Sequence, residues 1–323
     1  MTRPSDAIEV RRHELVVEDA LAGLRLDLGL ARSLPEYSRS RIRQWIEAGA
    51  VTVDGERCKP GSRLGAGARV VLVARLEAVI DDEPQPIALD IVHEDGSVLV
   101  VNKPPGLVVH PGAGNPHGTL VNALLHHAPD LSRLARAGLV HRLDKDTSGL
   151  LVVAKSTAAH AALVAAMSRR EIKREYLALV NGEVIAGERI EAPIGRHPTA
   201  RIKMAVNERG REAVTHTRVA ERLHGFTLLS VRLETGRTHQ IRVHLAHRGM
   251  PIVGDAVYGG RLKVPAGLDP ESRASLAVFR RQALHAQRLS FTHPQSGEAL
   301  DFQAPLPQDF AALLEALRQE VRP

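Results

Sequence analysis

The sequence contains a single cysteine, Cys58, among its 323 residues. One thiol cannot form an intrachain disulfide and cannot supply a cysteine-rich zinc site. No apolar run approaches the ~20 residues that a membrane-spanning helix needs, and residues 1–10 contain no hydrophobic signal core. We therefore expect a globular protein that stays in the cytoplasm and has no membrane partner.

Aromatic residues are also scarce, at 3% of the chain. No cluster of them resembles the aromatic pair with which an RNA-recognition motif stacks bases. The sequence also lacks a glycine-rich dinucleotide turn and a phosphate-binding loop. We therefore expect no nucleotide or other organic cofactor.

The chain is basic, with 43 Lys and Arg against 37 Asp and Glu, a net charge of +6 and a pI near 9.8. This balance favours a polyanionic partner such as RNA. Because few aromatic side chains can stack on bases, such an RNA would be held mainly through its phosphates, its shape and a local pocket.

The acidic, proline-containing segment 81–86 interrupts two differently patterned regions, as a linker does. It divides the chain into a small domain at 15–80 and a large domain at 87–320. In the large domain, expected strands alternate with helices irregularly, without the regular βαβ order of a doubly wound fold. The prediction is an α+β protein with a mixed, mostly antiparallel central sheet.

In the small domain, Ser38 is placed to cap a helix for which Gly49 is the stop signal. Ile42, Trp45 and Ile46 fall at i, i+3 and i+4 and define its buried face.

The same helix carries Arg39 and Arg43 on another face. A short strand at 51–53 follows and ends in an Asp-Gly turn. Helices followed by a small hairpin, with arginines on an exposed face, resemble the S4 RNA-binding module. Arg39 and Arg43 are candidate phosphate contacts, and the alternative is an ordinary solvated arginine face.

The most informative segment is residues 141–150, with the sequence HRLDKDTSGL. It places carboxylates among cations before Gly149 and an apolar run that predicts a buried strand at 150–154. Loops held by a rigid sheet are where catalytic groups gather, although a solvated turn would have a similar composition. Two further polar and cationic clusters follow, at 173–176 (KREY) and 234–244 (ETGRTHQIRVH).

Together with segments at 92–95, 103–106, 196–198 and 254–259, these clusters resemble the pseudouridine synthases that carry a His-Arg-Leu-Asp motif. The resemblance implies isomerisation of uridine to pseudouridine without a cofactor. The members that it points to modify 23S ribosomal RNA, so we expect that RNA, or a precursor of the large subunit, as the partner. The loop of helix 69 is the expected target, and no obligate protein partner is expected.

The resemblance also assigns roles to residues. Asp144 occupies the position of the family's catalytic aspartate, and Arg237 that of the arginine that pairs with it. Tyr176 matches a tyrosine that stacks on the target base and assists removal of the C5 proton. Arg142 matches an arginine that fills the space of the flipped base, and Ile241 an apolar wall of the pocket.

Several alternatives compete with these assignments. Asp146 could replace Asp144 as the catalytic carboxylate, because only the motif match selects between them. His239, His244 and His247 form the densest histidine cluster, but their spacing does not place all three on one helical face, so we expect no metal site. The residues around Ser148 lack the G-x-S-x-G pattern of a hydrolase.

Two functional alternatives also remain. Related enzymes carry out the same chemistry at other large-subunit sites. A non-catalytic S4-type protein of ribosome assembly would be expected to have lost at least one of Asp144, Tyr176 and Arg237, and all three are present.

Overall fold

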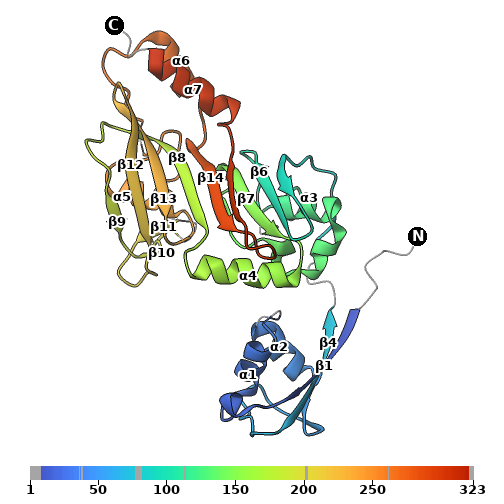
Figure 1. Ribbon diagram of the computed structural model, residues 1–323. Coiled ribbons are helices and arrows are strands. Elements are labelled where there is room, and N and C mark those ends of the chain that lie inside the picture. Colours follow the sequence, from blue (N-terminus) through green and yellow to red (C-terminus); the bar gives the residue numbers. More distant parts are fainter. Residues whose placement is uncertain are drawn as a thin grey trace.

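A computed structural model describes residues 9–35, 37, 39–76, 82–112, 114–200, 203–260 and 262–319. Figure 1 shows a small body built from the N-terminal residues and a large body built from the rest of the chain. Within these residues, no helix combines the length and the apolar character needed to cross a bilayer.

The small domain packs two helices against a four-stranded antiparallel sheet with the order β1-β4-β2-β3. Its elements are β1 (Glu9–Val16), η2 (Asp19–Leu21), α1 (Leu26–Ser33), α2 (Arg39–Glu47), β2 (Val51–Val53), β3 (Glu56–Arg57) and β4 (Arg69–Leu76).

The predicted helix and hairpin of this domain are confirmed. Ile42, Trp45 and Ile46 are buried together in its core. Asp54 and Gly55 both have positive φ in the turn between β2 and β3, as a tight two-residue hairpin turn requires. The proposed cap, Ser38, lies outside the described residues.

The start predicted for the small domain and the segment predicted as a linker both differ in the structure. The predicted start at Leu15 is too late, because β1 begins at Glu9 and pairs with β4 along its whole length. In the segment predicted as a linker, the Glu83 carbonyl accepts a hydrogen bond from the Asn122 side chain, and Gln85 bonds to Gly118 and Asn122. Residues 83–85 are therefore attached to the large domain.

A nine-stranded sheet organises the large domain, with the order β5-β6-β7-β14-β8-β13-β12-β9 and β15 paired to β14. Its strands are β5 (Ile91–Glu94), β6 (Val98–Lys103), β7 (Ser148–Ala154), β8 (Lys173–Asn181), β9 (Arg189–Glu191), β12 (Val214–Leu223), β13 (Phe226–Leu233), β14 (Leu284–Thr292) and β15 (Ala299–Gln303). Only β7 and β14 pair in parallel. This confirms the mixed, mostly antiparallel sheet and the α+β class.

The remaining elements lie around this sheet (Figure 1). They are α3 (Leu120–His127), η3 (Pro129–Arg133), η4 (Ala135–Gly138), α4 (Thr157–Ser168), the two-stranded sheet of β10 (Ile194–Arg196) and β11 (Met204–Val206), α5 (Gln240–His247), α6 (Pro270–Val278) and α7 (Gln308–Gln319).

The sheet is buried on both faces around β7. Leu151 and Val153 belong to the core that includes α3, and Leu150 and Val152 to the core that includes α4. Every residue of β7 is buried, as the apolar run at 150–154 predicted. Gly149 has φ +112°, and a Cβ there would lie 2.2 Å from the Ala286 carbonyl oxygen of β14. Only glycine lets the two strands approach this closely. The loop before β7 therefore ends at a fixed position in the sheet.

Candidate active site

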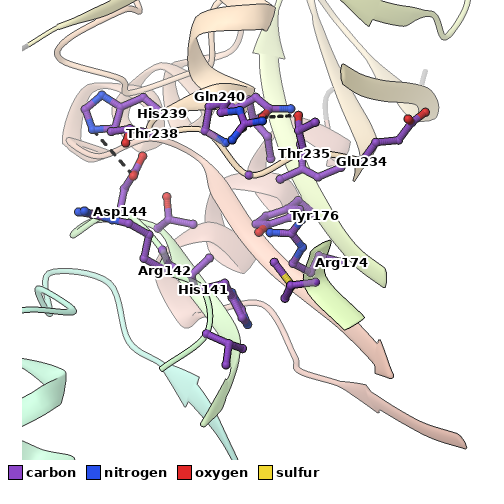
Figure 2. Close-up of a pocket in the computed structure, with 18 of the residues that line it drawn as sticks. His141, Arg142, Asp144, Arg174, Tyr176, Glu234, Thr235, Thr238, His239 and Gln240 are labelled. Atoms are coloured by element: carbon purple, nitrogen blue, oxygen red, sulfur yellow. Dashed lines mark hydrogen bonds and ion pairs between the residues drawn. The ribbon is translucent and has the colours of Figure 1, made fainter. Parts of the chain in front are cut away.

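A pocket of about 990 Å³ opens where three segments meet: the loop before β7, the start of β8, and the turn from β13 into α5. All five residues that the sequence assigned to the large-domain site line it. They are Arg142, Asp144, Tyr176, Arg237 and Ile241. Figure 2 shows Arg142, Asp144 and Tyr176 on neighbouring walls of this pocket. The structure therefore brings together residues almost 100 positions apart in the sequence.

The partner of Asp144 is Arg242 and not Arg237. Arg242 Nη1 donates to Asp144 Oδ2 at 3.0 Å. Arg237 instead donates from Nε to the Glu212 carbonyl oxygen at 2.9 Å. The expectation that Arg237 pairs with Asp144 is therefore wrong. Arg237 precedes α5, whereas Arg242 lies on its first turn and reaches the Asp144 loop from there.

A second carboxylate, Asp255, fixes the other edge of the Arg242 guanidinium. Arg242 donates to both oxygens of Asp255, from Nε at 2.7 Å and from Nη2 at 2.9 Å. Asp255 also accepts the backbone N–H groups of Val257 and Tyr258. A guanidinium bound along two edges has a fixed plane, so Asp255 determines how Arg242 faces Asp144.

Burial alone would lower the pKa of Arg242, which is 6% exposed, but hydrogen bonds and the charges of Asp255 and Asp144 outweigh it and raise that pKa. Burial likewise would raise the pKa of Asp255, but the hydrogen bonds from Arg242 lower it overall. Both groups are thus ionised at neutral pH, and Arg242 presents a fixed positive charge to Asp144.

His239 lies on the other side of Asp144, with Nε2 3.8 Å from Asp144 Oδ1 (Figure 2). Its Nδ1 is 2.8 Å from the Tyr258 hydroxyl, which already accepts the Met204 N–H. The hydroxyl can therefore donate its proton to Nδ1, and this selects the tautomer with a proton on Nε2, facing Asp144. Burial lowers the pKa of His239 despite the opposing charge of Asp144, so the ring is neutral at pH 7.

A buried lysine holds the loop that carries Asp144. Lys103 Nζ donates to the carbonyl oxygens of Pro104, Leu107 and Lys145 at 2.7, 3.0 and 2.9 Å. Burial lowers the pKa of Lys103 to about 7. Three carbonyl acceptors nevertheless need three N–H donors, which only the ammonium form supplies. Lys103 is therefore a charged clamp between the end of β6 and the Asp144 loop.

The two candidate carboxylates of the loop differ in position. Asp144 lines the pocket, whereas Asp146 is not among its lining residues. The carbonyl of Asp146 accepts a hydrogen bond from Arg281 on the other side of the loop. The geometry favours Asp144 as the carboxylate that can reach a ligand.

Tyr176 and Gln240 complete the framework of the site. Tyr176 is a buried residue of β8, and burial raises the pKa of its hydroxyl. Gln240 accepts from the Thr235 hydroxyl and the Arg237 N–H, and donates to Val214 and Thr215 on β12. These bonds fix the turn into α5 beside the pocket.

Two further residues that the sequence raised as alternatives, His244 and Ser148, are hydrogen-bonded to other residues of the protein. Both ring nitrogens of His244 are hydrogen-bonded, to Thr215 and to the Ala192 carbonyl. Across the described ranges, no group of three or more His, Cys, Asp or Glu is placed to hold a metal. The Ser148 hydroxyl bonds to buried His285, and neither residue lines the pocket.

In the small domain, Arg39 donates from Nε and Nη2 to Asp27, whose carboxylate is buried. Arg43 forms an exposed ion pair with Glu47 one turn further along α2. Both arginines remain at least half exposed, so an ion pair does not prevent either from meeting a phosphate.

Sequence reasoning gave no role in the site to five residues: Lys103, His239, Arg242, Asp255 and the pocket-lining Arg174. Arg242 and His239 lie in the 234–244 cluster and Arg174 in the 173–176 cluster, so composition placed them near the site but gave them no role. Lys103 belongs to the 103–106 segment, where nothing in the sequence indicates a buried ammonium.

Comparisons with known proteins agree with this geometry. The model of the RNA pseudouridylate synthase family matches residues 97–247, and the S4 domain model matches residues 24–70. The "Ribosomal large subunit pseudouridine synthase D" of Xanthomonas campestris pv. campestris is 51% identical over 316 residues, covering 98% of this chain and 96% of that protein. The protein of the same name from Escherichia coli strain K12 is 50% identical over 305 residues, covering 94% of each.

Among solved structures, "Human RNA Pseudouridylate Synthase Domain Containing 4" superposes with a TM-score of 0.57 at 26% identity. It covers 71% of this chain and 92% of that one. The fold and the pocket define an RNA-modifying enzyme with an S4 domain. The chain belongs to the pseudouridine synthases. This confirms the family that its sequence motifs resemble.

Proposed function

We propose that this enzyme converts uridine to pseudouridine in 23S ribosomal RNA, in the loop of helix 69, during maturation of the large subunit. The names of the relatives from X. campestris and E. coli support the large ribosomal subunit as the source of the substrate. The observation that carries the chemistry is the Asp144 carboxylate, held by Arg242 inside the pocket. We further propose that it acts in the cytoplasm on precursor subunits and needs no obligate protein partner.

In this proposal, Asp144 is the catalytic carboxylate. It attacks the sugar or the base, or removes a sugar proton, and each of these routes needs its negative charge. The Arg242 guanidinium donates to this carboxylate at 3.0 Å. Arg242 therefore takes the part that the sequence assigned to Arg237, and Asp255 holds Arg242 in place. Arg237 lines the pocket as a further cation.

The target uridine must leave its stack to reach Asp144, at a cost of a few kcal/mol. Arg142 is exposed at the pocket, and in this proposal it occupies the space that the base vacates. Tyr176 and Ile241 offer the base an aromatic and an aliphatic surface. Arg39 and Arg43 of the S4 domain add phosphate contacts, which help to offset the cost of flipping.

Two alternatives are kept. The same chemistry would serve at other uridines of large-subunit RNA, since the residues proposed for it act on a single nucleotide. A non-catalytic assembly protein would have no need for the Asp144–Arg242–Asp255 arrangement, which buries charged groups at a cost in stability.

The test is to map pseudouridines in ribosomal RNA from a strain lacking this gene, complemented with the wild-type or the Asp144→Asn protein. We expect helix 69 pseudouridines to disappear on deletion and to return only with the wild type. Loss at other large-subunit sites would select the first alternative. An unchanged map would refute the proposed function.

A further inference from the structure

Arg174 is a buried cation without a partner among the residues that the structure describes. It is 6% exposed, its Nε is enclosed without a hydrogen-bond acceptor, and no hydrogen bond or ion pair joins its guanidinium to any other residue that the structure describes. An enclosed cationic group without an acceptor is unfavourable in a folded protein. Such a side chain at a pocket wall is suited to a ligand that brings the missing acceptor.

The position of Arg174 points to the pocket as the place of that ligand. Arg174 and Tyr176 are two residues apart on β8, so their side chains lie on the same face of the sheet, and both line the pocket (Figure 2). Gly236 leaves space for the guanidinium, because a Cβ there would lie 3.0 Å from Arg174 Nη1. Nearby, His141 also has an enclosed nitrogen, Nδ1, without a partner.

The other arginines of the pocket differ from Arg174. Arg237 and Arg242 are less exposed, but each donates to an acceptor of the protein. The other four are exposed, and one of them, Arg170, is paired with Glu212 and Glu234: Arg136, Arg142, Arg170 and Arg211. Exposed cations suit the phosphates, which stay near solvent. Arg174 lies in the buried wall beside the Tyr176 ring, where the flat base, the least polar part of the nucleotide, is best accommodated.

We propose that Arg174 binds the target uracil and stabilises the negative charge that its ring carries during the isomerisation. This inference rests on the proposed conversion of uridine. When the N1–C1′ bond breaks, its electron pair remains on the base and spreads over N1, O2 and O4. This electron pair then forms the new bond between C5 and C1′. The C5 proton leaves, and N1 takes up a proton. If Asp144 instead adds to C6, the charge falls on the enolate oxygen O4, so Arg174 acts in either route.

A preorganised donor at a developing oxyanion typically contributes about 10²- to 10³-fold in rate. Arg174→Met should therefore lower the single-turnover rate by about 100-fold or more, on the scale of such donors. Because the substitution also removes an unpaired buried charge, the melting temperature of the free enzyme should stay the same or rise. A structural role would instead lower the melting temperature.

The experiment measures single-turnover pseudouridine formation, RNA affinity at several salt concentrations, and melting temperature. It compares the wild type with Arg174→Met, Arg174→Lys, Gly236→Ala and Arg218→Met. Arg218 is an exposed residue of β12 that does not line the pocket, so its variant controls for the loss of one positive charge. Gly236→Ala keeps the charge but displaces the guanidinium, and should slow the reaction less than Arg174→Met does.

Two readouts separate the base from the phosphate as the ligand. A phosphate contact would make the salt dependence of affinity shallower by about one unit in Arg174→Met, and we expect no such change. In a synthetic RNA with 5-fluorouridine at the target, the fluorine stabilises the ring anion. The rate gap between wild type and Arg174→Met, followed as loss of the target nucleotide, should then be smaller than with uridine.

An Arg174→Met enzyme with a wild-type rate, a lowered melting temperature or a shallower salt dependence would overturn the inference. An equal gap with both nucleotides would overturn it as well. These outcomes are distinct from failure of the proposed function, in which the wild type itself would form no pseudouridine in the ribosomal RNA.

Discussion

Replacing Arg242 by methionine tests the charge arrangement of the active site. The substitution keeps the approximate length of the side chain but leaves Asp144 without its cation and leaves Asp255, whose side chain is 0% exposed, as an unpaired buried carboxylate. Removing one partner of a buried ion pair costs about 3–5 kcal/mol. For a domain of this size, that loss lowers the melting temperature by roughly 6–20 °C, at about 2–4 °C per kcal/mol.

The loss of stability in Arg242→Met should depend on pH. In the wild type, Arg242 lowers the pKa of Asp255, so the stability from this pair is present above the unfolded value of 3.8 and is lost as pH falls through the folded pKa. In Arg242→Met, burial still raises the pKa of Asp255, and only the backbone N–H groups of Val257 and Tyr258 are left to lower it, so this pKa rises relative to wild type. Protonation of Asp255 then stabilises the folded variant. The difference in free energy of unfolding between wild type and Arg242→Met should therefore become smaller as pH falls from 7 toward 4.

The double variant Arg242→Met/Asp255→Asn separates stability from catalysis. Neutralising Asp255 removes the unpaired charge and should recover much of the lost melting temperature, but Asp144 would still lack its cation. We therefore expect a stable but slow enzyme, measured by calorimetry and by single-turnover pseudouridine formation. Normal turnover of either variant, or a melting temperature of Arg242→Met equal to wild type at pH 7, would refute this reasoning.

Three further predictions follow from the structure. Lys103→Met leaves three carbonyls without their donor, at about 1–3 kcal/mol each if they stay buried, and should lower both the melting temperature and the turnover rate; a variant as active and stable as wild type would exclude the clamp. Tyr176→Phe should bind RNA almost normally but turn over much more slowly in single-turnover assays, whereas an unchanged rate would leave Tyr176 a packing residue. Removing residues 1–80 should leave a folded large domain with weaker RNA affinity and a shallower salt dependence, and an identical salt dependence would exclude a role for Arg39 and Arg43.

Much of the fold could be predicted because its signals are local. The apolar run of β7 and the spacing of Ile42, Trp45 and Ile46 on α2 follow directly from strand and helix periodicity. The strand β1 was missed because Glu9–Val16 is rich in charged residues. Its backbone nevertheless pairs with β4, and this pairing depends on residues about 60 positions away.

The site could be predicted only as far as its segments. Motif order placed Asp144, Tyr176 and the 234–244 cluster together, and the pocket confirms that they meet. Composition could not tell which arginine reaches Asp144, because Arg237 and Arg242 are five residues apart on either side of the helix start. The left-handed φ of +57° at His239 lies between the two arginines, at the start of α5, and nothing in the local sequence indicates it.

Nor could the sequence show that Arg174 lacks a partner among the described residues. Its neighbour Glu175 suggests an ion pair, but successive residues of a strand point to opposite faces.

The most direct test of the central claim compares Asp144→Asn with Asp146→Asn by release of tritium from C5-labelled uridine in 23S ribosomal RNA. Both amides keep the size of the side chain, so RNA binding and melting temperature serve as controls for each variant. The account predicts no tritium release from Asp144→Asn despite normal RNA binding, and release close to wild type from Asp146→Asn. Substantial release by Asp144→Asn would contradict it.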